Sequence, residues 1–529
     1  MSGGLSLVPR PLAPDGSLTA RLLAGRGPVE LPTPATAPVR AAGPSRLGIE
    51  AFGTTSPRVR EKLDRVLAGE GLVVTTGQQP VLFLGPMYVL YKALTAIAVA
   101  QRLEERFRVP VVPVFWIASD DHDWDEIGRT SLLDRHHELQ TITLAPAHQD
   151  AGRSAGPAKL GPDVKRLISE MSQYVPESEF TAMYIELLRD AYRQDGTVSE
   201  AFSTALRGVL DGRELAWVDS ASASLRRAAV PLLSRFVAHS DEIIDAMEAG
   251  ATALAQGGVE APIPSLPGGL PLFYDGDGRR ERLYVEGGDI RAGREGASAP
   301  SGTWLERLAD RPESFSPNVT TRPVLESYLM PVAATVLGPS EIAYWSQLPP
   351  VFEWCGVSFP AIVPRVSWTV LEARVARILE KVDIDLEDLA DGGDAAVSRV
   401  TEDARPEAVD AGFRTVRAAL SGEMEILERA LIDEFPGLRG AVGKTRKGLS
   451  DLVTALERQV DAEARRRHDT VVEQIHRAAQ NVFPARKPQE RVLSPFYFLA
   501  RYGPAVIDLI DDDTRARVSE SLAAPGAGG

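Results

Sequence analysis

The chain has 529 residues, of which 44% are hydrophobic and 25% charged, a composition typical of folded globular proteins and unlike that of disordered or fibrous ones. Its net charge of -15 opposes binding to phosphate backbones and anionic lipids, so neither nucleic acid nor a membrane is expected as a partner. The single cysteine, Cys355, excludes an intrachain disulfide, and the N-terminal residues lack the pattern of a signal peptide, so we expect a cytoplasmic protein. The length predicts several domains.

The first regular elements follow an irregular N-terminal arm. Residues 1–47 are rich in proline, glycine and alanine and show little periodicity. The β-branched run GLVVTTG at 71–77 then predicts a strand, and 86–107 predict a long helix that begins at Pro86. Residues 109–119, VPVVPVFWIAS, are apolar without alternation, as in a strand covered on both faces. Together these elements predict a right-handed βαβ unit of a parallel sheet.

One stretch of the predicted helix is long enough to cross a bilayer. Residues 81–100 are almost wholly apolar. However, Lys92 lies at the centre of this stretch, and Gly85-Pro86 would break a helix near its start. We therefore expect a helix buried inside a globular domain.

The middle of the chain resembles insertions into a sheet domain. Residues 160–255 follow a helical pattern that is interrupted by a short strand at 214–220, and residues 271–288 predict a β-hairpin. The core pattern resumes at 316–348, and 359–370 predict one late strand.

Beyond residue 400 the pattern is that of two long amphipathic helices. They are broken at FPGLRGAVG, residues 435–443, which predicts an antiparallel helical hairpin. Apolar residues recur at spacings of three and four, namely Val409, Phe413, Val416, Leu420, Met424, Leu427 and Leu431, and again Leu449, Leu452, Leu456 and Val460. Such a hairpin exposes an apolar stripe unless a partner covers it, so we expect a homodimer.

Two polar segments follow the first two predicted strands. TTGQQPVLFLGP at 75–86 and SDDHDWDE at 119–126 lie beyond the carboxyl ends of parallel strands, where ligands bind in open α/β sheets. The acidic segment matches no metal-binding template, so we expect no metal site there. It can equally be the cap of a helix, in which Asp120 to Asp123 satisfy free backbone N–H groups.

The glutamine segment is not a standard phosphate loop, because it has neither GxxxxGK[ST] nor GxGxxG. Its amides, followed by the helix start at Gly85-Pro86, can still hold an anion or a ribose. The alternative is an ordinary turn between strand and helix. Gly338-Pro339 repeats the helix start, and Arg365 near a later strand end can bind carboxylate or phosphate, although arginines form surface ion pairs more often.

Several motifs together resemble those of the bacillithiol-biosynthesis cysteine-adding enzyme family. They are TGQQ, LFLGPMYVLYK, PVFWIASDDHDWDE, SPNVTTRP, GPSEIAYW, PRVS and QERVLSPFYFLARYG, in the family's order. The chain departs from the usual family pattern at Pro80-Val81, at Leu84, and at Asp120, where the family usually has glutamate.

The resemblance implies an α/β fold: a Rossmann-like parallel sheet core with connecting-peptide insertions and a C-terminal α-helical coiled-coil hairpin. It implies the domain order 1–47 arm, 48–135 first half of the core, 136–315 helical and β-hairpin insertions with some core strands, 316–380 second half of the core, 381–485 antiparallel coiled-coil hairpin and 486–529 C-terminal segment returning to the core. It also implies a dimer formed through the hairpin.

The implied reaction joins the carboxyl group of cysteine to the amine of glucosaminyl malate to form bacillithiol. The expected cofactor is ATP or another nucleotide, with Mg as its candidate companion ion, because a free carboxylate has to be activated before an amine attacks it. Two alternatives remain open: another ATP-dependent amide or aminoacyl ligase, and a non-catalytic dimeric scaffold.

The family motifs also place the expected site residues. The catalytic candidates are His122, Asp123, Asp121 and Glu126, with His122 or Asp123 as the general base. The substrate-binding candidates are Gln78, Gln79, Gly85, Tyr91, Asn318, Arg322, Gly338, Glu341, Tyr344 and Arg365. The nucleotide-binding candidates are Arg491, Tyr497, Arg501 and Tyr502.

Overall fold

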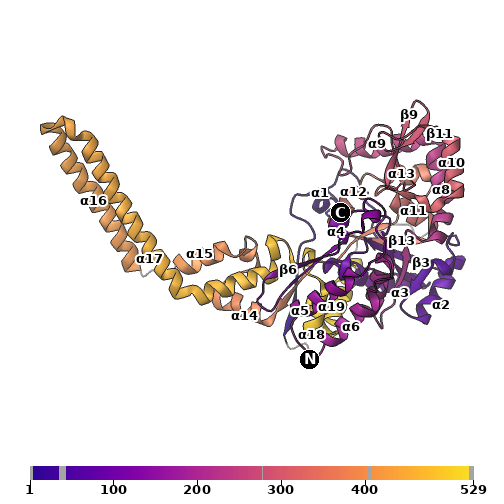
Figure 1. Cartoon of the computed structure of the whole chain (residues 1–529), viewed down its shortest axis with the longest axis horizontal. Coiled ribbons are helices and arrows are strands. Elements are labelled where there is room, and N and C mark those ends of the chain that lie inside the picture. Colours follow the sequence, from indigo (N-terminus) through magenta and orange to yellow (C-terminus); the bar gives the residue numbers. More distant parts are fainter. Residues whose placement is uncertain (1–3, 35–42, 277, 403–406, 524–529) are drawn as a thin grey trace. The chain divides into compact units, whose positions relative to one another are not determined.

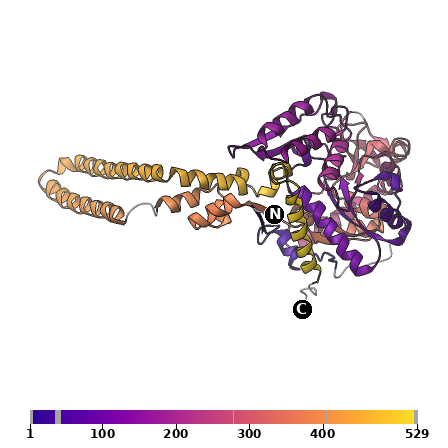
Figure 2. The same cartoon turned by 90° about the horizontal axis from the view of Figure 1, so that it is seen from below.

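The computed structural model describes residues 4–34, 43–276, 278–402 and 407–523. It divides into two compact units, one formed by Met1–Val370 with Glu490–Gly529 and the other by Leu371–Gln489. Figures 1 and 2 show the two units in two perpendicular views.

The first unit is built on a six-stranded sheet with the order β14-β13-β3-β4-β7-β2. The strands are β2 (Phe52–Thr54), β3 (Leu72–Gln78), β4 (Val111–Ile117), β7 (Ala216–Asp219), β13 (Val332–Leu337) and β14 (Ala361–Pro364). All neighbours pair in parallel except β2, which runs antiparallel to β7 at the edge. β4 is buried at every residue and β3 at all but its last, which explains why these strands are continuous apolar runs. The predicted Rossmann-like α/β core is confirmed.

Helix α3 (Tyr88–Phe107) connects β3 to β4 and is buried from Val89 to Ala100, Lys92 included. The C-terminal helix α19 (Ala505–Ala523) packs against it, and Arg515 donates a hydrogen bond to Gln101 at 2.8 Å. No helix in the described part of the chain is long and apolar enough to cross a membrane.

Helices and a second sheet occupy the region between β4 and β13. The helices are α4 (Trp124–Ile127), α5 (Asp163–Tyr174), α6 (Thr181–Ala191), α7 (Val198–Val209), α8 (Ala223–Ala238), α9 (Ser240–Gln256), α10 (Ser301–Asp310) and α11 (Arg322–Leu329). The second sheet has the order β11-β10-β9-β8-β12, with β8 (Gly269–Tyr274), β9 (Glu281–Glu286), β10 (Asp289–Ala292), β11 (Ala299–Pro300) and β12 (Phe315–Pro317). β8 and β9 form the predicted hairpin, although residue 277 in its turn lies outside the described residues.

The remaining elements of the first unit are short. They are α2 (Pro57–Arg65), β5 (Arg129–Leu133), β6 (Leu139–Thr143), α12 (Pro339–Trp345), α13 (Pro349–Cys355) and α18 (Pro495–Tyr502).

Two predicted segments differ from the structure. The arm is not wholly irregular, since it contains β1 (Leu5–Pro9) and α1 (Leu18–Leu23), the latter capped by the Ser17 side chain; 1–3 and 35–42 lie outside the described residues. The late strand is two strands, β14 and β15 (Trp368–Glu372), and β15 leaves the main sheet to pair with β1. The break falls at Arg365–Ser367, where Arg365 N–H still donates to Leu337 at 2.9 Å.

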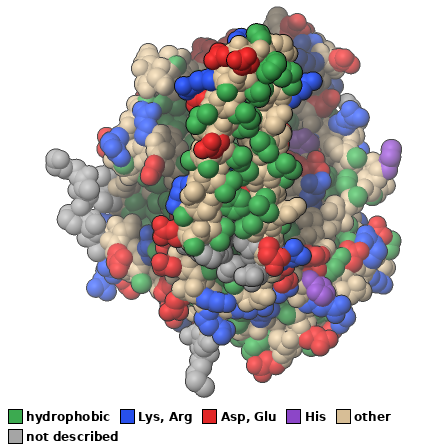
Figure 3. Space-filling model, turned by 90° about the vertical axis from the view of Figure 1, so that its left-hand side faces the viewer, with side chains coloured by type: hydrophobic (Ala, Val, Ile, Leu, Met, Phe, Trp, Pro, Cys, Tyr) green, Lys and Arg blue, Asp and Glu red, His purple; other side chains and the backbone are tan. Residues whose placement is uncertain are grey.

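The second unit contains a long antiparallel hairpin of α16 (Glu407–Glu434) and α17 (Arg439–Val482), together with α14 (Ala373–Val382) and α15 (Asp394–Glu402). Arg417 of α16 pairs with Glu457 of α17, and Glu428, later in α16, pairs with Arg446, earlier in α17. The two helices are therefore antiparallel. The predicted coiled-coil hairpin is confirmed. Figure 3 shows a band of hydrophobic side chains along it, and the exposed ones are Val416, Ile426, Leu427, Phe435, Leu438, Leu452 and Leu456.

Candidate functional site

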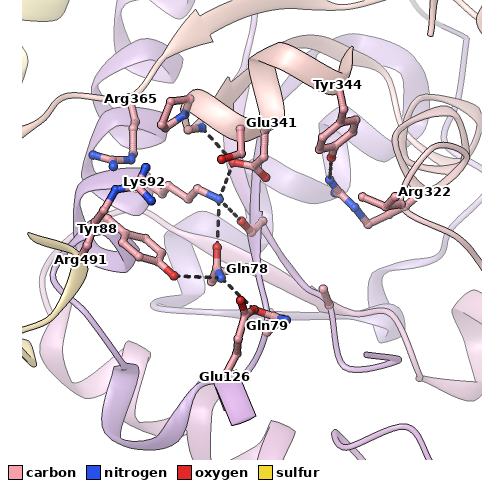
Figure 4. A pocket seen from close by; sticks show the side chains of 16 residues that line it. Gln78, Gln79, Tyr88, Lys92, Glu126, Arg322, Glu341, Tyr344, Arg365 and Arg491 are labelled. Carbon is pink, nitrogen blue, oxygen red and sulfur yellow. Dashed lines mark hydrogen bonds and ion pairs between the residues drawn. The ribbon is translucent and has the colours of Figure 1, made fainter. Parts of the chain in front are cut away.

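A cavity of about 320 Å³ lies at the carboxyl ends of the central parallel strands. The chain passes from β3 to β4 and β7 on one side and later adds β13 and β14 on the other side of β3. The strand order therefore reverses between β3 and β13, and this switch point is where open α/β sheets bind ligands. Figure 4 shows the cavity, which is lined by Gly77, Gln78, Gln79, Tyr88, Lys92, Ala118, Glu126, Val319, Arg322, Gly338, Pro339, Ser340, Glu341, Tyr344, Arg365 and Arg491.

The two glutamines at the end of β3 connect several sides of the cavity. Gln78 Nε2 donates hydrogen bonds to Gln79 Oε1 at 3.2 Å and to the Tyr88 hydroxyl at 3.4 Å. Gln79 Nε2 donates to Asp121 Oδ2 at 2.8 Å. The TGQQ segment and the acidic segment are therefore held together as one site.

Lys92 lies at the base of the cavity, with a buried ammonium group. It donates to the Gly77 carbonyl at 2.8 Å and to Gln78 Oε1 at 3.0 Å, and it pairs with Glu341 Oε2 at 2.6 Å. Burial lowers the pKa of Lys92, although the Glu341 carboxylate opposes this change. Our site prediction missed Lys92; the signal was a lone lysine in an otherwise apolar helix.

Three further pairs fix the other polar walls. Glu341 accepts the Gly338 N–H at 2.8 Å and so caps α12. Arg322 donates to the Tyr344 hydroxyl at 2.9 Å and pairs with Glu326. Arg365 makes a two-fold contact with a buried glutamate, Glu490, at 2.7 and 2.8 Å, which ties the C-terminal segment to the site.

The Tyr88 hydroxyl is kept neutral at the cavity wall. Burial raises the pKa of Tyr88 to about 12, and the negative charges of Glu126 and Glu341 add to this effect. Arg365 and Arg491 oppose the shift. Tyr88 can therefore serve as a hydrogen-bond donor to a ligand at neutral pH.

The acidic segment combines a cap with a charged cluster. Asp123 accepts the N–H groups of Asp125 at 3.0 Å and Glu126 at 3.3 Å, and it begins α4. His122 is 44% exposed; its Nδ1 lies 3.3 Å from Arg280 Nη1 and 3.7 Å from Asp121 Oδ1. The capping interpretation therefore describes Asp123, whereas His122 does not take part in the cap.

Asp120 is buried beneath this segment. Arg280 and Arg226 approach its Oδ2 at 3.7 and 3.9 Å, and the Ser220 hydroxyl donates a hydrogen bond to its Oδ1. Burial alone would raise the pKa of Asp120, but the two guanidinium groups and Ser220 outweigh it and lower the pKa. Our site prediction missed Arg226 and Arg280, because they come from α8 and from the residue before β9, far away in the sequence.

The cavity collects half of the predicted site residues. Those that line it are Gln78, Gln79, Glu126, Arg322, Gly338, Glu341, Tyr344, Arg365 and Arg491. Asp121, His122 and Asp123 lie outside the lining set, and Asp121 is connected to it through Gln79. The described residues contain no cluster of three or more metal-ligating side chains.

Six further predicted residues do not line the cavity, each for a structural reason. The Tyr91 hydroxyl donates to the Trp368 carbonyl at 3.3 Å, and Asn318 Oδ1 accepts the Thr320 and Thr321 N–H groups. Gly85 has a φ of +53°, which the turn into α3 requires. The other three, Tyr497, Arg501 and Tyr502, belong to α18, where Arg501 donates to the Tyr497 hydroxyl at 3.0 Å.

Comparison with known proteins gives matches over most of the chain. Residues 49–366 match the family described as Bacillithiol biosynthesis BshC, N-terminal Rossmann-like domain, and residues 368–514 match the BshC C-terminal coiled-coil domain. Three proteins named "Putative cysteine ligase BshC" are similar to the chain. The one from Symbiobacterium thermophilum is 31% identical over 84% of this chain and 82% of its own length. The one from Prosthecochloris aestuarii is 30% identical over 87% of this chain and 84% of its own length. The one from Salinibacter ruber is 29% identical over 85% of this chain and 82% of its own length.

Proposed function

Because the chain belongs to the bacillithiol biosynthesis BshC family, we propose that it is a ligase that forms the amide bond between the carboxyl group of cysteine and the amine of glucosaminyl malate. The single observation that carries this proposal is the cavity at the switch point between β3 and β13, where the family motifs TGQQ and GPSE meet.

The chemistry requires an activated carboxyl group and a deprotonated amine. An amine that carries a proton has no lone pair with which to attack, so a base has to remove it. In our proposal His122 is this base, because its imidazole is exposed beside Asp121, which Gln79 ties to the cavity. The amide groups of Gln78 and Gln79 and the neutral Tyr88 hydroxyl orient the substrates.

A nucleoside triphosphate is the proposed activator of the cysteine carboxylate. The residues that line the cavity do not fit its phosphates: Lys92, Arg322 and Arg365 are each already neutralised by a carboxylate, and Arg491 alone cannot balance three phosphate groups. No residue of the cavity is therefore assigned to the nucleotide or to Mg.

The homodimer and the cytoplasmic location expected from the sequence belong to the same proposal. The exposed apolar side chains on α16 and α17 support a dimer, because stripes of this kind on a hairpin are usually covered by a partner.

Thiol profiling of a deletion strain tests the proposal in the cell. We expect bacillithiol to be lost and glucosaminyl malate to accumulate, and a plasmid carrying the intact gene to reverse both changes. Unchanged bacillithiol in the deletion strain would count against the proposed function.

A further inference from the structure

The cations that line the cavity are not equally available to a ligand. Lys92 is paired with Glu341 at 2.6 Å, Arg322 with Glu326, and Arg365 with Glu490 at 2.7 Å. Each of these three charges is neutralised within the protein. Arg491 is different: among the described residues, its side chain has no hydrogen-bond or ion-pair partner.

The carboxylates that line the cavity divide in the same way. Glu341 accepts from Lys92 and from the Gly338 N–H. Glu126 is exposed at the rim, and in the described part of the chain no group donates to its carboxylate. The cavity therefore offers a ligand one uncommitted positive and one uncommitted negative charge.

We propose that Glu126 and Arg491 form a subsite for an amino-acid zwitterion, in which Glu126 binds the α-ammonium group and Arg491 binds the α-carboxylate. The inference rests on the proposed function only for the identity of the amino acid, cysteine. Figure 4 shows both side chains at the cavity, with Glu126 near the two glutamines and Arg491 near Tyr88.

Both charges act on the same part of the cavity. The hydroxyl of Tyr88 feels the negative charge of Glu126 and, in the opposite sense, the positive charge of Arg491. Gln78 donates to this hydroxyl at 3.4 Å, and both side chains line the same cavity as the two charged groups, where they are neutral hydrogen-bonding partners.

The balance of charge favours a zwitterion over the other substrates of a ligase. A malate group brings two carboxylates and a triphosphate brings more negative charge still, so either would leave anionic groups without a free cation in this cavity. An amino acid brings one charge of each sign and leaves none unpaired. A volume of about 320 Å³ lies at the lower end of the range for small-molecule sites.

The arrangement also protects the reaction from a side product. A carboxylate beside the α-ammonium favours its protonated form, which cannot attack an activated carboxyl group. Glu126 would thus prevent cysteine from acting as its own acceptor. Arg491 would hold the carboxylate in place for activation.

The test is calorimetric titration of the full-length protein, under reducing conditions, with L-cysteine, 3-mercaptopropionate and cysteamine. The second ligand lacks the ammonium and the third lacks the carboxylate. We expect the wild type to bind each analogue about tenfold more weakly than cysteine, as the loss of one charged hydrogen bond predicts. Glu126→Gln should weaken cysteine about tenfold but leave 3-mercaptopropionate unchanged, and Arg491→Met should weaken cysteine but leave cysteamine unchanged.

Two matched variants control for general effects of charge. Asp125→Asn on α4 and Lys487→Met, four residues before Arg491 in the sequence, change exposed charges outside the lining set and should preserve the wild-type order. The subsite is overturned if the wild type does not bind cysteine, or if each variant weakens cysteine and its analogue equally. Because binding is measured without turnover, absence of bacillithiol formation with the expected binding pattern would refute the proposed function but leave the subsite intact.

Discussion

The Asp120 carboxylate is approached by two buried guanidinium groups, and this arrangement contributes to the way the stability of the first unit depends on pH. The pKa of Asp120 in the folded protein is below the ordinary value of 3.8. At a pH between the folded pKa and the ordinary pKa, the unfolded chain therefore binds more protons than the folded protein does. The stabilisation is complete above about pH 4. We expect it to be lost as the pH falls through the folded pKa of Asp120.

Asp120→Asn tests this dependence. At pH 7 the variant leaves Arg226 and Arg280 buried without their shared counter-charge, which should cost about 3 to 5 kcal/mol. Thermal melts followed by circular dichroism between pH 3 and 7 should show a lower Tm and a shallower acid dependence than in the wild type. Asp125→Asn, an exposed neighbour, should change neither, and an equal acid dependence in Asp120→Asn would contradict the assignment.

Substitution of His122 distinguishes the two interpretations of the acidic segment, a helix cap and a catalytic site. His122→Ala should keep the Tm within a few degrees, because its exposed side chain contributes little to the core. Turnover should fall by about 10², the loss typical of a missing general base. Steady-state assays of product formation, with melting curves as the control for folding, measure both, and near-normal turnover would show that this histidine is not the base.

For single residues, the sequence predicted which side chains lie at strand ends better than it predicted which side chains form pairs across the fold. Gln78, Gln79 and Gly338 were predictable because the carboxyl ends of parallel strands converge. The ion pairs of Lys92 and Arg280 were not predictable, because the pairing of a buried charge depends on which distant side chains the fold brings to it. The assignment of Tyr91 relied on its motif, whereas its hydroxyl bonds the Trp368 carbonyl.

The turn between β3 and α3 has an unusual backbone. Phe83, Leu84 and Gly85 have φ values of +49°, +60° and +53° in succession, and the first two are not glycine. Residues with side chains rarely adopt this left-handed region, and each costs of order 1 to 3 kcal/mol unless its surroundings impose it. Here both side chains are fully buried, so packing holds the turn beside the cavity.

Gly85→Ala should disturb this turn. A Cβ at Gly85 would lie 2.6 Å from Val81 Cγ1, and the positive φ adds strain. We expect a Tm lower by several degrees and weaker cysteine binding, as measured by melting and titration. Gly302→Ala on α10 has open space and should behave as wild type; a normal Gly85→Ala protein would contradict the described turn.

Among the elements, those with a continuous apolar run or a long helical period were predictable from the sequence. β3, β4 and α3 differ from their predicted bounds by a few residues. The break between β14 and β15 was missed, because 359–370 was interpreted as one strand although Arg365 and Ser367 interrupt its apolar pattern. The change of partner, from β13 for β14 to β1 for β15, depends on tertiary contacts. The helix α1 was missed because it is short and depends on its Ser17 cap.

For the whole molecule, the apolar band on the hairpin is the proposed dimer contact. Leu452 and Leu456 are 67% and 54% exposed, and they lie one turn apart on α17. Leu452→Glu with Leu456→Glu should place charges in the proposed dimer contact and give a monomeric mass in multi-angle light scattering, where the wild type gives a dimer.

Lys447→Glu with Ser450→Glu is the matched control, since helical periodicity turns these exposed positions away from Leu452. It should stay dimeric. A monomeric wild type, or dissociation of both double variants, would contradict a dimer formed through this band. The sequence predicted the hairpin and its stripe from spacing alone, but not which apolar residues face the partner helix, because that depends on the register of α16 against α17.

The most direct test of the proposed function is product formation by the purified protein. Cysteine, glucosaminyl malate and ATP are incubated with it, with and without Mg, and the products are identified by mass spectrometry; omission of each component in turn is the control. We predict that bacillithiol appears only when the protein, cysteine and the amino-sugar malate are all present, and that its formation depends on the nucleotide. Absence of bacillithiol with every nucleotide and metal tested, from folded protein that binds cysteine, would contradict the account.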